Sequence, residues 1–315
     1  MAMKACKCGS GNGNTGFPSC VPQPGITSTL FLMYQVANDG TRNQIDCDSD
    51  TVNSAFVTGK INESDVSKRW VPIVNFENVT DERADAVLQT LDSGVTRFLR
   101  QGPRTFSGFI FDGASPELAR QINKGRCNKN AVYYVDEEGQ LVGAKDSTDA
   151  NKINPVKITT FYAEYVKKTN DSDAAVVINF TVDKREDDGD LRVLIPGEGV
   201  ANDVDLNDVD GLLEPCAEVV TGTITTTEVQ IDYYLPFGDF CAPQPVEGLV
   251  LADIALFNVT DNAAVTPLTV TESATVAGRY TITYTAQDAS DVLYSDITKS
   301  GYDGDKVKEV TYTTP

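Results

Sequence analysis

The stretch at residues 155–195 constrains the fold more than any other part of the chain. Within residues 174–184 every second residue is apolar, namely Val176, Ile178, Phe180 and Val182. Polar residues, Asn179, Thr181 and Asp183, take the positions between them. A period of two places one set of side chains in a core and the other in water. Polar turns bound this segment, so we expect three antiparallel strands, with 156–166 before it and 191–195 after it.

Capping residues indicate a first helix after Thr80. Asp81 and Glu82 would lie in its first turn, where the helix dipole favours acidic side chains. An apolar stripe at helical spacing follows, made of Ala84, Val87, Leu88 and Leu91. Gly94 would end this helix.

A second helix is expected after Ser115, with Pro116 at its first position and Gly125 at its end. Its apolar stripe consists of Leu118, Ala119 and Ile122. A strand at 106–111 precedes it. A hairpin at 131–143 follows, with the acidic turn Asp136-Glu137-Glu138-Gly139.

Short strands make up most of what remains. We expect them at 26–36, 66–74, 219–234, 249–257, 279–286 and 307–313. The fold class is therefore mainly β: a β-sandwich or barrel-like domain with two short helices, followed by a small C-terminal β-sandwich.

Composition divides the chain into three parts. Residues 1–25 are rich in Gly, Asn, Ser, Pro and Cys and predict a flexible arm. Residues 26–242 form a β-rich domain. The segment 241–245 contains two prolines and predicts a linker, and residues 246–315 form the second domain.

The net charge of −20 and the absence of histidine limit the function classes. An acidic chain does not hold nucleic acid by neutralising phosphates, but it can surround nucleic acid without adhering to it. Without histidine, the Ser-His and Cys-His nucleophile pairs and all His-containing metal sites are excluded. We therefore expect a protein that is not an enzyme and has no cofactor.

Nothing in the sequence indicates export or membrane insertion. The N-terminal residues lack the apolar core of a signal peptide, and no run approaches the ~20 apolar residues that span a bilayer. We expect synthesis in the cytoplasm, with the seven cysteines reduced rather than paired.

Two clusters in the sequence are candidates for metal sites. The thiolates of Cys6, Cys8, Cys20 and Cys47 offer four zinc ligands, but no pair has the usual two-residue spacer. The loop 203–214 offers oxygen ligands at Asp203, Asp205, Asn207 and Glu214 for calcium, but Asp208 stands where such loops need glycine. A mobile arm with incidental thiols and a solvated acidic loop are the favoured interpretations, and no metal site is predicted.

Two further motifs suggest chemistry and are better explained by backbone geometry. The paired carboxylates in 136–139 and 187–190 resemble acid–base pairs, but both lie at hairpin turns, where Asp and Gly are favoured. The glycine-rich segment 9–13 lacks the lysine and the preceding strand of a phosphate loop. We predict no catalytic residue in either.

The order of elements resembles that of tail tube proteins of tailed bacteriophages. The cues are the strand 106–111 leading into the helix at 115–124, the hairpin at 133–143, and Asp187-Asp188-Gly189-Asp190-Leu191 between late strands. Residues 246–315 are similar to the immunoglobulin-like modules of phage tail and capsid proteins. The resemblance implies a virion protein, made in the bacterial host cytoplasm, that assembles into stacked rings. DNA would pass through the channel without specific binding, and other virion proteins would be partners.

Two alternatives remain at this stage. One is a capsid decoration or auxiliary virion protein with the same modules. The other is a cell-surface glycan-binding adhesin, since tyrosine-rich faces of β-sandwiches suit sugars. Self-assembly separates both virion proteins from the adhesin, and a tube separates the tail protein from the decoration protein.

Overall fold

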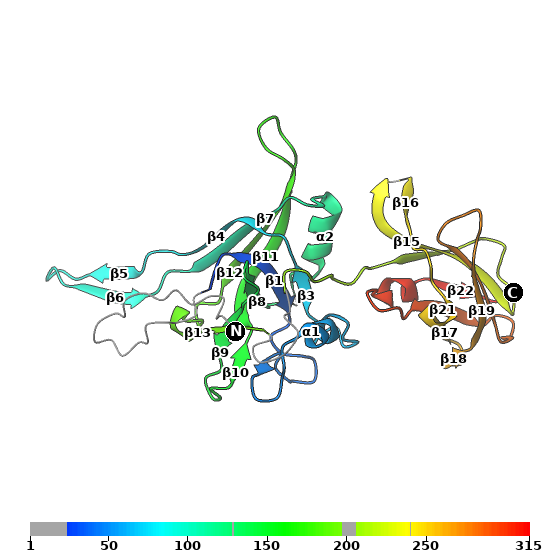
Figure 1. Ribbon diagram of the computed structural model, residues 1–315, viewed down its shortest axis with the longest axis horizontal. Coiled ribbons are helices and arrows are strands. Elements are labelled where there is room, and N and C mark those ends of the chain that lie inside the picture. Colours follow the sequence, from blue (N-terminus) through cyan, green and yellow to red (C-terminus); the bar gives the residue numbers. More distant parts are fainter. Residues whose placement is uncertain (1–23, 128, 197–205, 240) are drawn as a thin grey trace. The chain divides into compact units, whose positions relative to one another are not determined.

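The computed structural model describes residues 24–127, 129–196, 206–239 and 241–315 (Figure 1). Strands account for 44% and helices for 10%, which confirms the mainly-β class. The predicted arm at 1–25 falls almost wholly outside the described residues. The chain divides into two compact units between Gly211 and Leu212, whereas the sequence placed the change near residue 242.

The first unit contains, in its described part, one bent 11-stranded sheet and one separate hairpin. Its main strand order is β2-β10-β9-β8-β11-β12-β7-β4, with β1 on β8, β3 on β1 and β13 on β9. The strands are β1 (Thr27–Met33), β2 (Ile45–Asp46), β3 (Val71–Ile73), β4 (Glu77–Arg83), β5 (Val87–Thr90), β6 (Thr96–Arg100), β7 (Arg104–Ile110), β8 (Ala131–Asp136), β9 (Leu141–Lys145), β10 (Lys152–Asn154), β11 (Val156–Val166), β12 (Ala175–Val182) and β13 (Leu191–Leu194).

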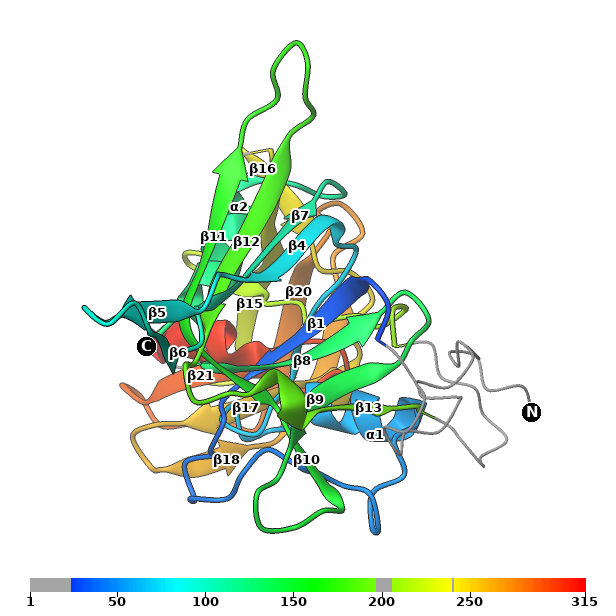
Figure 2. The same cartoon turned by 90° about the vertical axis from the view of Figure 1, so that its left-hand side faces the viewer.

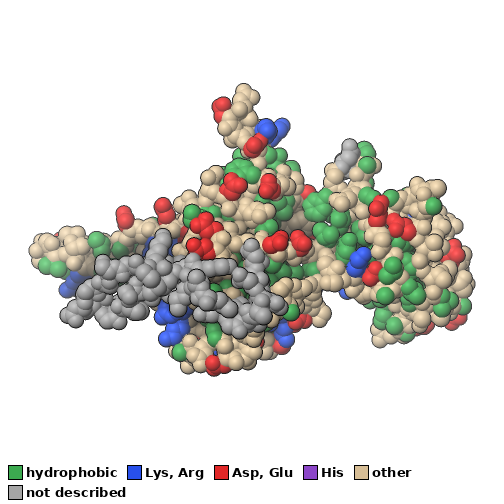
Figure 3. All heavy atoms as spheres, viewed as in Figure 1, with side chains coloured by type: hydrophobic (Ala, Val, Ile, Leu, Met, Phe, Trp, Pro, Cys, Tyr) green, Lys and Arg blue, Asp and Glu red, His purple; other side chains and the backbone are tan. Residues whose placement is uncertain are grey.

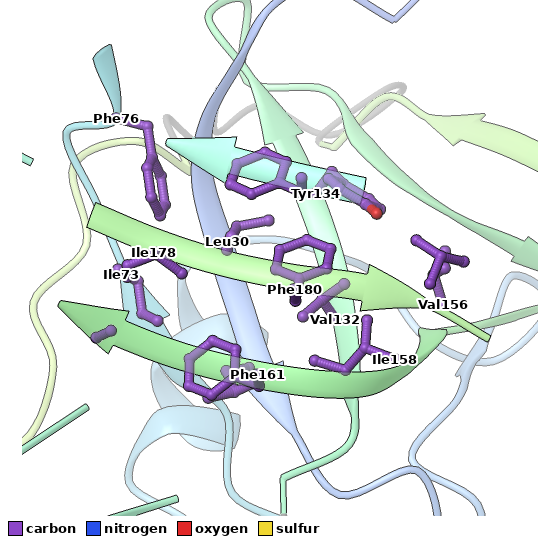
Figure 4. Packing of buried hydrophobic residues seen from close by; sticks show 14 of the residues in the cluster. Leu30, Ile73, Phe76, Val132, Tyr134, Val156, Ile158, Phe161, Ile178 and Phe180 are labelled. Carbon is purple, nitrogen blue, oxygen red and sulfur yellow. The ribbon is translucent and has the colours of Figure 1, made fainter. Parts of the chain in front are cut away.

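Strand β11 connects the two halves of this sheet. Its first residues pair with β8, through Val156 opposite Val132, and the rest of the strand pairs with β12. A bulge between Ile158 and Thr160 interrupts the register, and bulges bend a strand. The sheet can therefore turn back on itself, so that β1, β8 and β9 contribute to the same core as β7, β11 and β12 (Figure 4).

The core confirms the predicted alternation in β12. Val176, Ile178, Phe180 and Val182 are all buried. The ring of Phe180 stacks on Phe106, with 4.6 Å between centroids and 8° between planes. Tyr134 from β8 lies beside both rings (Figure 4). Offset stacked rings add to the stabilisation that burial alone provides.

The first unit has two α-helices in its described part, and α2 (Pro116–Lys124) packs on β11 and β12. Helix α2 was predicted, and its N-cap Ser115 accepts a hydrogen bond from the Leu118 amide at 3.1 Å. Helix α1 (Ser54–Ile61) was missed, because eight residues that bury only Val57 and Ile61 leave no clear stripe. A separate aromatic group forms near α1, where Trp70 contacts the rings of Phe31, Phe56 and Tyr133.

The helix predicted at 80–94 is wrong, because this segment forms β4, a connection and β5. Local propensity is a weak prior that tertiary pairing overrides. Here β4 pairs with β7, and Arg104 of β7 forms an ion pair with Asp81. Gly94, the expected helix end, lies instead in a tight turn with φ +79°.

The expected three-stranded arrangement at 155–195 is also corrected. Strand β13 does not return to β12 but pairs with β9, where Val193 lies opposite Val142. Both edges of β12 are already occupied, by β11 on one side and β7 on the other. The strand therefore crosses to the other half of the sheet.

The second unit is a β-sandwich. Its strands are β14 (Cys216–Val219), β15 (Glu228–Asp239), β16 (Ala242–Pro245), β17 (Ile254–Asn258), β18 (Ala263–Val265), β19 (Pro267–Glu272), β20 (Arg279–Tyr284), β21 (Val292–Ile297) and β22 (Thr311–Thr313). One sheet has the order β14-β15-β20-β19 and the other β18-β17-β21-β22. This corresponds to the A-B-E-D and C-F-G order of immunoglobulin-like sandwiches, with β18 beside strand C.

The linker predicted at 241–245 is wrong. Residues 242–245 form β16, which pairs with β15 through Tyr234 opposite Pro245. Prolines are tolerated there because β16 lies at an edge and pairs with β15 alone among the described strands. Strands β14 and β15, assigned by sequence to the first domain, supply two of the five strands of one sheet of the sandwich.

Candidate assembly surface

The face of β4, β7, β12 and β11 that points away from the core, hereafter the outer face, is polar and acidic. The four strands lie side by side in Figure 2. Residues directly opposite one another share a face, which gives three rows: Glu77, Phe109, Val177 and Glu164; Thr80, Ser107, Asn179 and Tyr162; Glu82, Thr105, Thr181 and Thr160. These rows contain three carboxylates and no lysine or arginine, so the charge along the rows themselves is negative and repels polyanions.

Strand β4 leaves one edge of this sheet open. In the described chain it pairs with β7, and its other side has no strand partner. Unpaired backbone groups at an edge can accept a strand from another chain. Charged residues lie along β4 at Glu77, Asp81, Glu82 and Arg83, and charges on an edge strand oppose unselective pairing. Asp81 and Arg83 are held within the chain by ion pairs with Arg104 and Asp188.

The β5–β6 hairpin, with its connections at residues 84–103, projects from the first unit (Figure 1). All residues of both strands are exposed. Five of its large apolar side chains are exposed to between 36% and 59%: Val87, Leu88, Val95, Phe98 and Leu99. Apolar side chains are visible on it in Figure 3. An isolated two-stranded hairpin is at best marginally stable in water, and clustered exposed apolar residues mark interaction sites.

An ion network anchors the β5–β6 hairpin at its base. Arg83 donates to both oxygens of Asp188, at 2.6 and 2.8 Å, and Arg104 donates to Asp188 at 2.9 Å. Arg104 also binds Asp81 through two hydrogen bonds, at 2.6 and 2.7 Å. The hydrogen bonds from Arg83, assisted by Arg104, hold the pKa of Asp188 below its usual value. The base is thus fixed, although the hairpin itself has no core.

Gly102 allows the two connections of the β5–β6 hairpin to approach closely. A side chain at this position would overlap the backbone carbonyl of Ala84. The Ala84 amide donates to the carbonyl of Pro103 at 2.9 Å, which joins the outgoing and returning chain. The sequence could have revealed this hairpin, because Asp92-Ser93-Gly94 between apolar segments is a turn signal.

The metal candidates are not assembled in the described part of the chain. Cys6, Cys8 and Cys20 lie outside the described residues, as do Asp203, Asp205 and the glycine-rich segment 9–13. Cys47 is an exposed free thiol, and the Asn207 amide donates to the Asp136 carbonyl at 2.9 Å. Among described residues, no three His, Cys, Asp or Glu side chains are grouped to hold a metal ion.

Both carboxylate turns have structural partners. Asp136 is buried and accepts hydrogen bonds from the amides of Gly25, Glu138 and Gln140. In the other turn, Asp187 accepts from the Gly189 amide at 3.0 Å. Asp136 and Asp187 therefore shape their own turns, whereas Asp188 is bound by Arg83 and Arg104. The turn at 187–190 is not the hairpin turn that was expected, because β13 pairs with β9 and not with β12.

The described residues contain no helix that combines the length and apolar character needed to cross a lipid bilayer. Comparison with known proteins gave no matching family model and no similar curated protein.

Proposed function

We propose that this protein is a non-enzymatic structural subunit of a bacteriophage virion, which assembles into the stacked rings of a tail tube around a channel for DNA. The observation that carries the proposal is the β5–β6 hairpin. Five exposed apolar side chains on one projecting element need a partner surface, and a second copy of the chain provides one in a self-assembling protein.

Two other features support a ring. The open edge of β4 offers backbone groups to a neighbouring subunit, and a closed ring leaves no such edge free. The outer face, with Glu77, Glu82 and Glu164 and no cation in its three rows, is suited to line the channel. DNA would then slide past without specific binding, because like charges repel.

The proposal places the protein in the virion after synthesis in the host cytoplasm, with other virion proteins as further partners. It is tested by sedimentation velocity and negative-stain electron microscopy of the purified chain over a wide concentration range. Rings or hollow tubes are the expected result. Discrete small oligomers would favour a decoration protein, and a monomer at every concentration would contradict self-assembly.

A matched pair of variants tests the role of the β5–β6 hairpin. Leu88 on β5 and Leu268 on β19 are exposed to 57% and 55%. Leu88→Asp should prevent ring formation, because a charge in an apolar contact must be desolvated. Leu268→Asp adds the same charge to the second unit and should assemble like the parent chain. Equal behaviour of the two variants would contradict an interface at the hairpin.

A further inference from the structure

A pocket of about 570 Å³ lies at the root of the β5–β6 hairpin and is strongly basic. One wall is the returning chain from Phe98 to Pro103. The other is formed by the start of β11, the end of β12 and the residues that follow β12, up to Arg185. Five cations line it: Arg83, Arg100, Lys157, Lys184 and Arg185. Such a concentration of positive charge is unusual in a chain with 46 acidic and 26 basic residues.

Three of these cations have no carboxylate partner in the described chain. Arg83 is neutralised by Asp188, and Lys157 lies 3.6 Å from Asp183, the one carboxylate in the lining. The other three, Arg100, Lys184 and Arg185, are exposed and form no ion pair with a described residue. The pocket therefore presents a net positive charge of three that the first unit does not use internally.

The walls of the pocket are held in place before any ligand arrives. Arg83 in the lining is fixed by Asp188 and by a hydrogen bond to the Gly102 carbonyl at 3.0 Å. Gly102 in turn allows the returning chain to lie against Ala84. Phe98, which is 59% exposed, adds an apolar contact in the lining. A preformed site of this kind loses little ordering entropy on binding.

We propose that this pocket binds a carboxylate-rich segment of a second copy of the chain, with Arg100, Lys184 and Arg185 as the contacts. Charge complementarity carries the choice of partner, because the rest of the chain is acidic and its turns expose the carboxylates of Glu137, Glu138, Asp187 and Asp190. DNA is the less suitable ligand, since the neighbouring outer face would repel its phosphates. The inference rests on the proposed self-assembly and specifies its contact.

Zero-length crosslinking tests the contact directly. A carbodiimide joins a lysine amine to a carboxylate in contact with it, so a mixture of unlabelled and ¹⁵N-labelled chains distinguishes links between copies from links within one. Mass spectrometry of the assembled mixture should find Lys184 linked to an Asp or Glu of the other isotopic form. Assembled protein in which Lys184 forms no such link would overturn the proposal.

Charge reversal provides an independent measurement. The triple variant Arg100→Glu, Lys184→Glu and Arg185→Glu should weaken self-association about 10-fold or more. The difference in affinity between this variant and the parent chain should decrease at high salt, because salt screens exposed charges. The control carries the same change at three other cations of the first unit that are exposed and have no described carboxylate partner: Arg126, Lys145 and Lys167. Equal effects in both variants would attribute the loss to net charge and overturn the pocket contact.

The outcomes separate this inference from the proposed function. If the parent chain forms rings and the triple variant forms them equally well, the pocket contact is wrong and the tail tube proposal stands. If the parent chain never associates, both are wrong. If the triple variant associates normally but loses binding to a DNA duplex that the parent chain retains, the pocket serves DNA rather than a second copy.

Discussion

Phe180 and Phe98 are the same residue type in opposite surroundings, so truncating each of them separates folding from assembly. Phe180 is 2% exposed in the core, and Phe98 is 59% exposed on β6. Phe180→Ala should lower the free energy of unfolding of the first unit by about 3–5 kcal/mol, the range for a buried phenylalanine. The loss should be near the upper end, because β12 is paired on both edges and cannot shift to fill the cavity.

Phe98→Ala should leave stability within about 0.5 kcal/mol, as expected of an exposed position. Its effect should appear in assembly instead. Burying a phenylalanine at an interface contributes about 1.5–3 kcal/mol, so self-association should weaken about 10- to 150-fold. Phe180→Ala should retain normal association wherever it remains folded.

Trp70 is the single tryptophan, is buried, and lies in the first unit, so its fluorescence during urea unfolding reports on that unit alone. Measurements at a concentration below the assembly threshold give the free energy of unfolding, and sedimentation above it gives association. An interface at Phe98 is refuted if Phe98→Ala destabilises the unit as much as Phe180→Ala, or if Phe98→Ala assembles like the parent chain.

Three further predictions follow from the described contacts. Gly102→Ala should destabilise the base of the β5–β6 hairpin by about 1–3 kcal/mol, because the new side chain overlaps Ala84, and should speed trypsin cleavage at Arg97 and Arg100. The control is Gly94→Ala, whose new side chain meets no neighbour. It should cost about 1 kcal/mol of stability and change the cleavage little. Asp188 has a lowered pKa in the folded state, so its contribution to stability is full above its unfolded pKa of ~3.9 and is lost as pH falls through the folded pKa. The urea midpoints of the parent chain and of Asp188→Asn should therefore converge at low pH. A difference between the two midpoints that stays constant with pH would contradict the role of Asp188 in anchoring the hairpin. Residues 212–315 expressed alone should show a cooperative unfolding transition, whereas 246–315 should not, because that fragment lacks β14 and β15.

Sequence reasoning succeeded where one residue pattern determined burial. The alternation in β12 and in Tyr280, Ile282 and Tyr284 identified core residues, because a strand with one buried face admits a single register. Ser115 and Pro116 identified α2, because caps act through neighbouring backbone groups. These signals are local and need no knowledge of the partner strand.

The failures arose where the decisive contact is distant in the sequence. The acidic residues after Thr80 suit a helix start, but Asp81 instead binds Arg104, and nothing local indicates that pairing. The route of β13 depends on which edges of β12 are free, and this is known only once β7 is placed. The two prolines of β16 suggested a linker, although an edge strand tolerates them as well.

The β5–β6 hairpin lies away from the core of its unit, and this explains why local sequence patterns predicted a helix for part of it. A hairpin that packs on its own chain alternates between core and water, and this alternation identifies its strands. The β5–β6 hairpin has no core in its own unit, so Leu88 and Phe98, although directly opposite one another, are both exposed. The positions of its apolar residues are therefore set by the surface that they would contact on another subunit, and not by a core in their own unit. Arg97 and Arg100 lie among them in an acidic chain, and two such chains repel one another except where opposite charges meet. Exposed apolar residues favour association in general, and the placement of these charges would select one relative orientation of the two associating subunits.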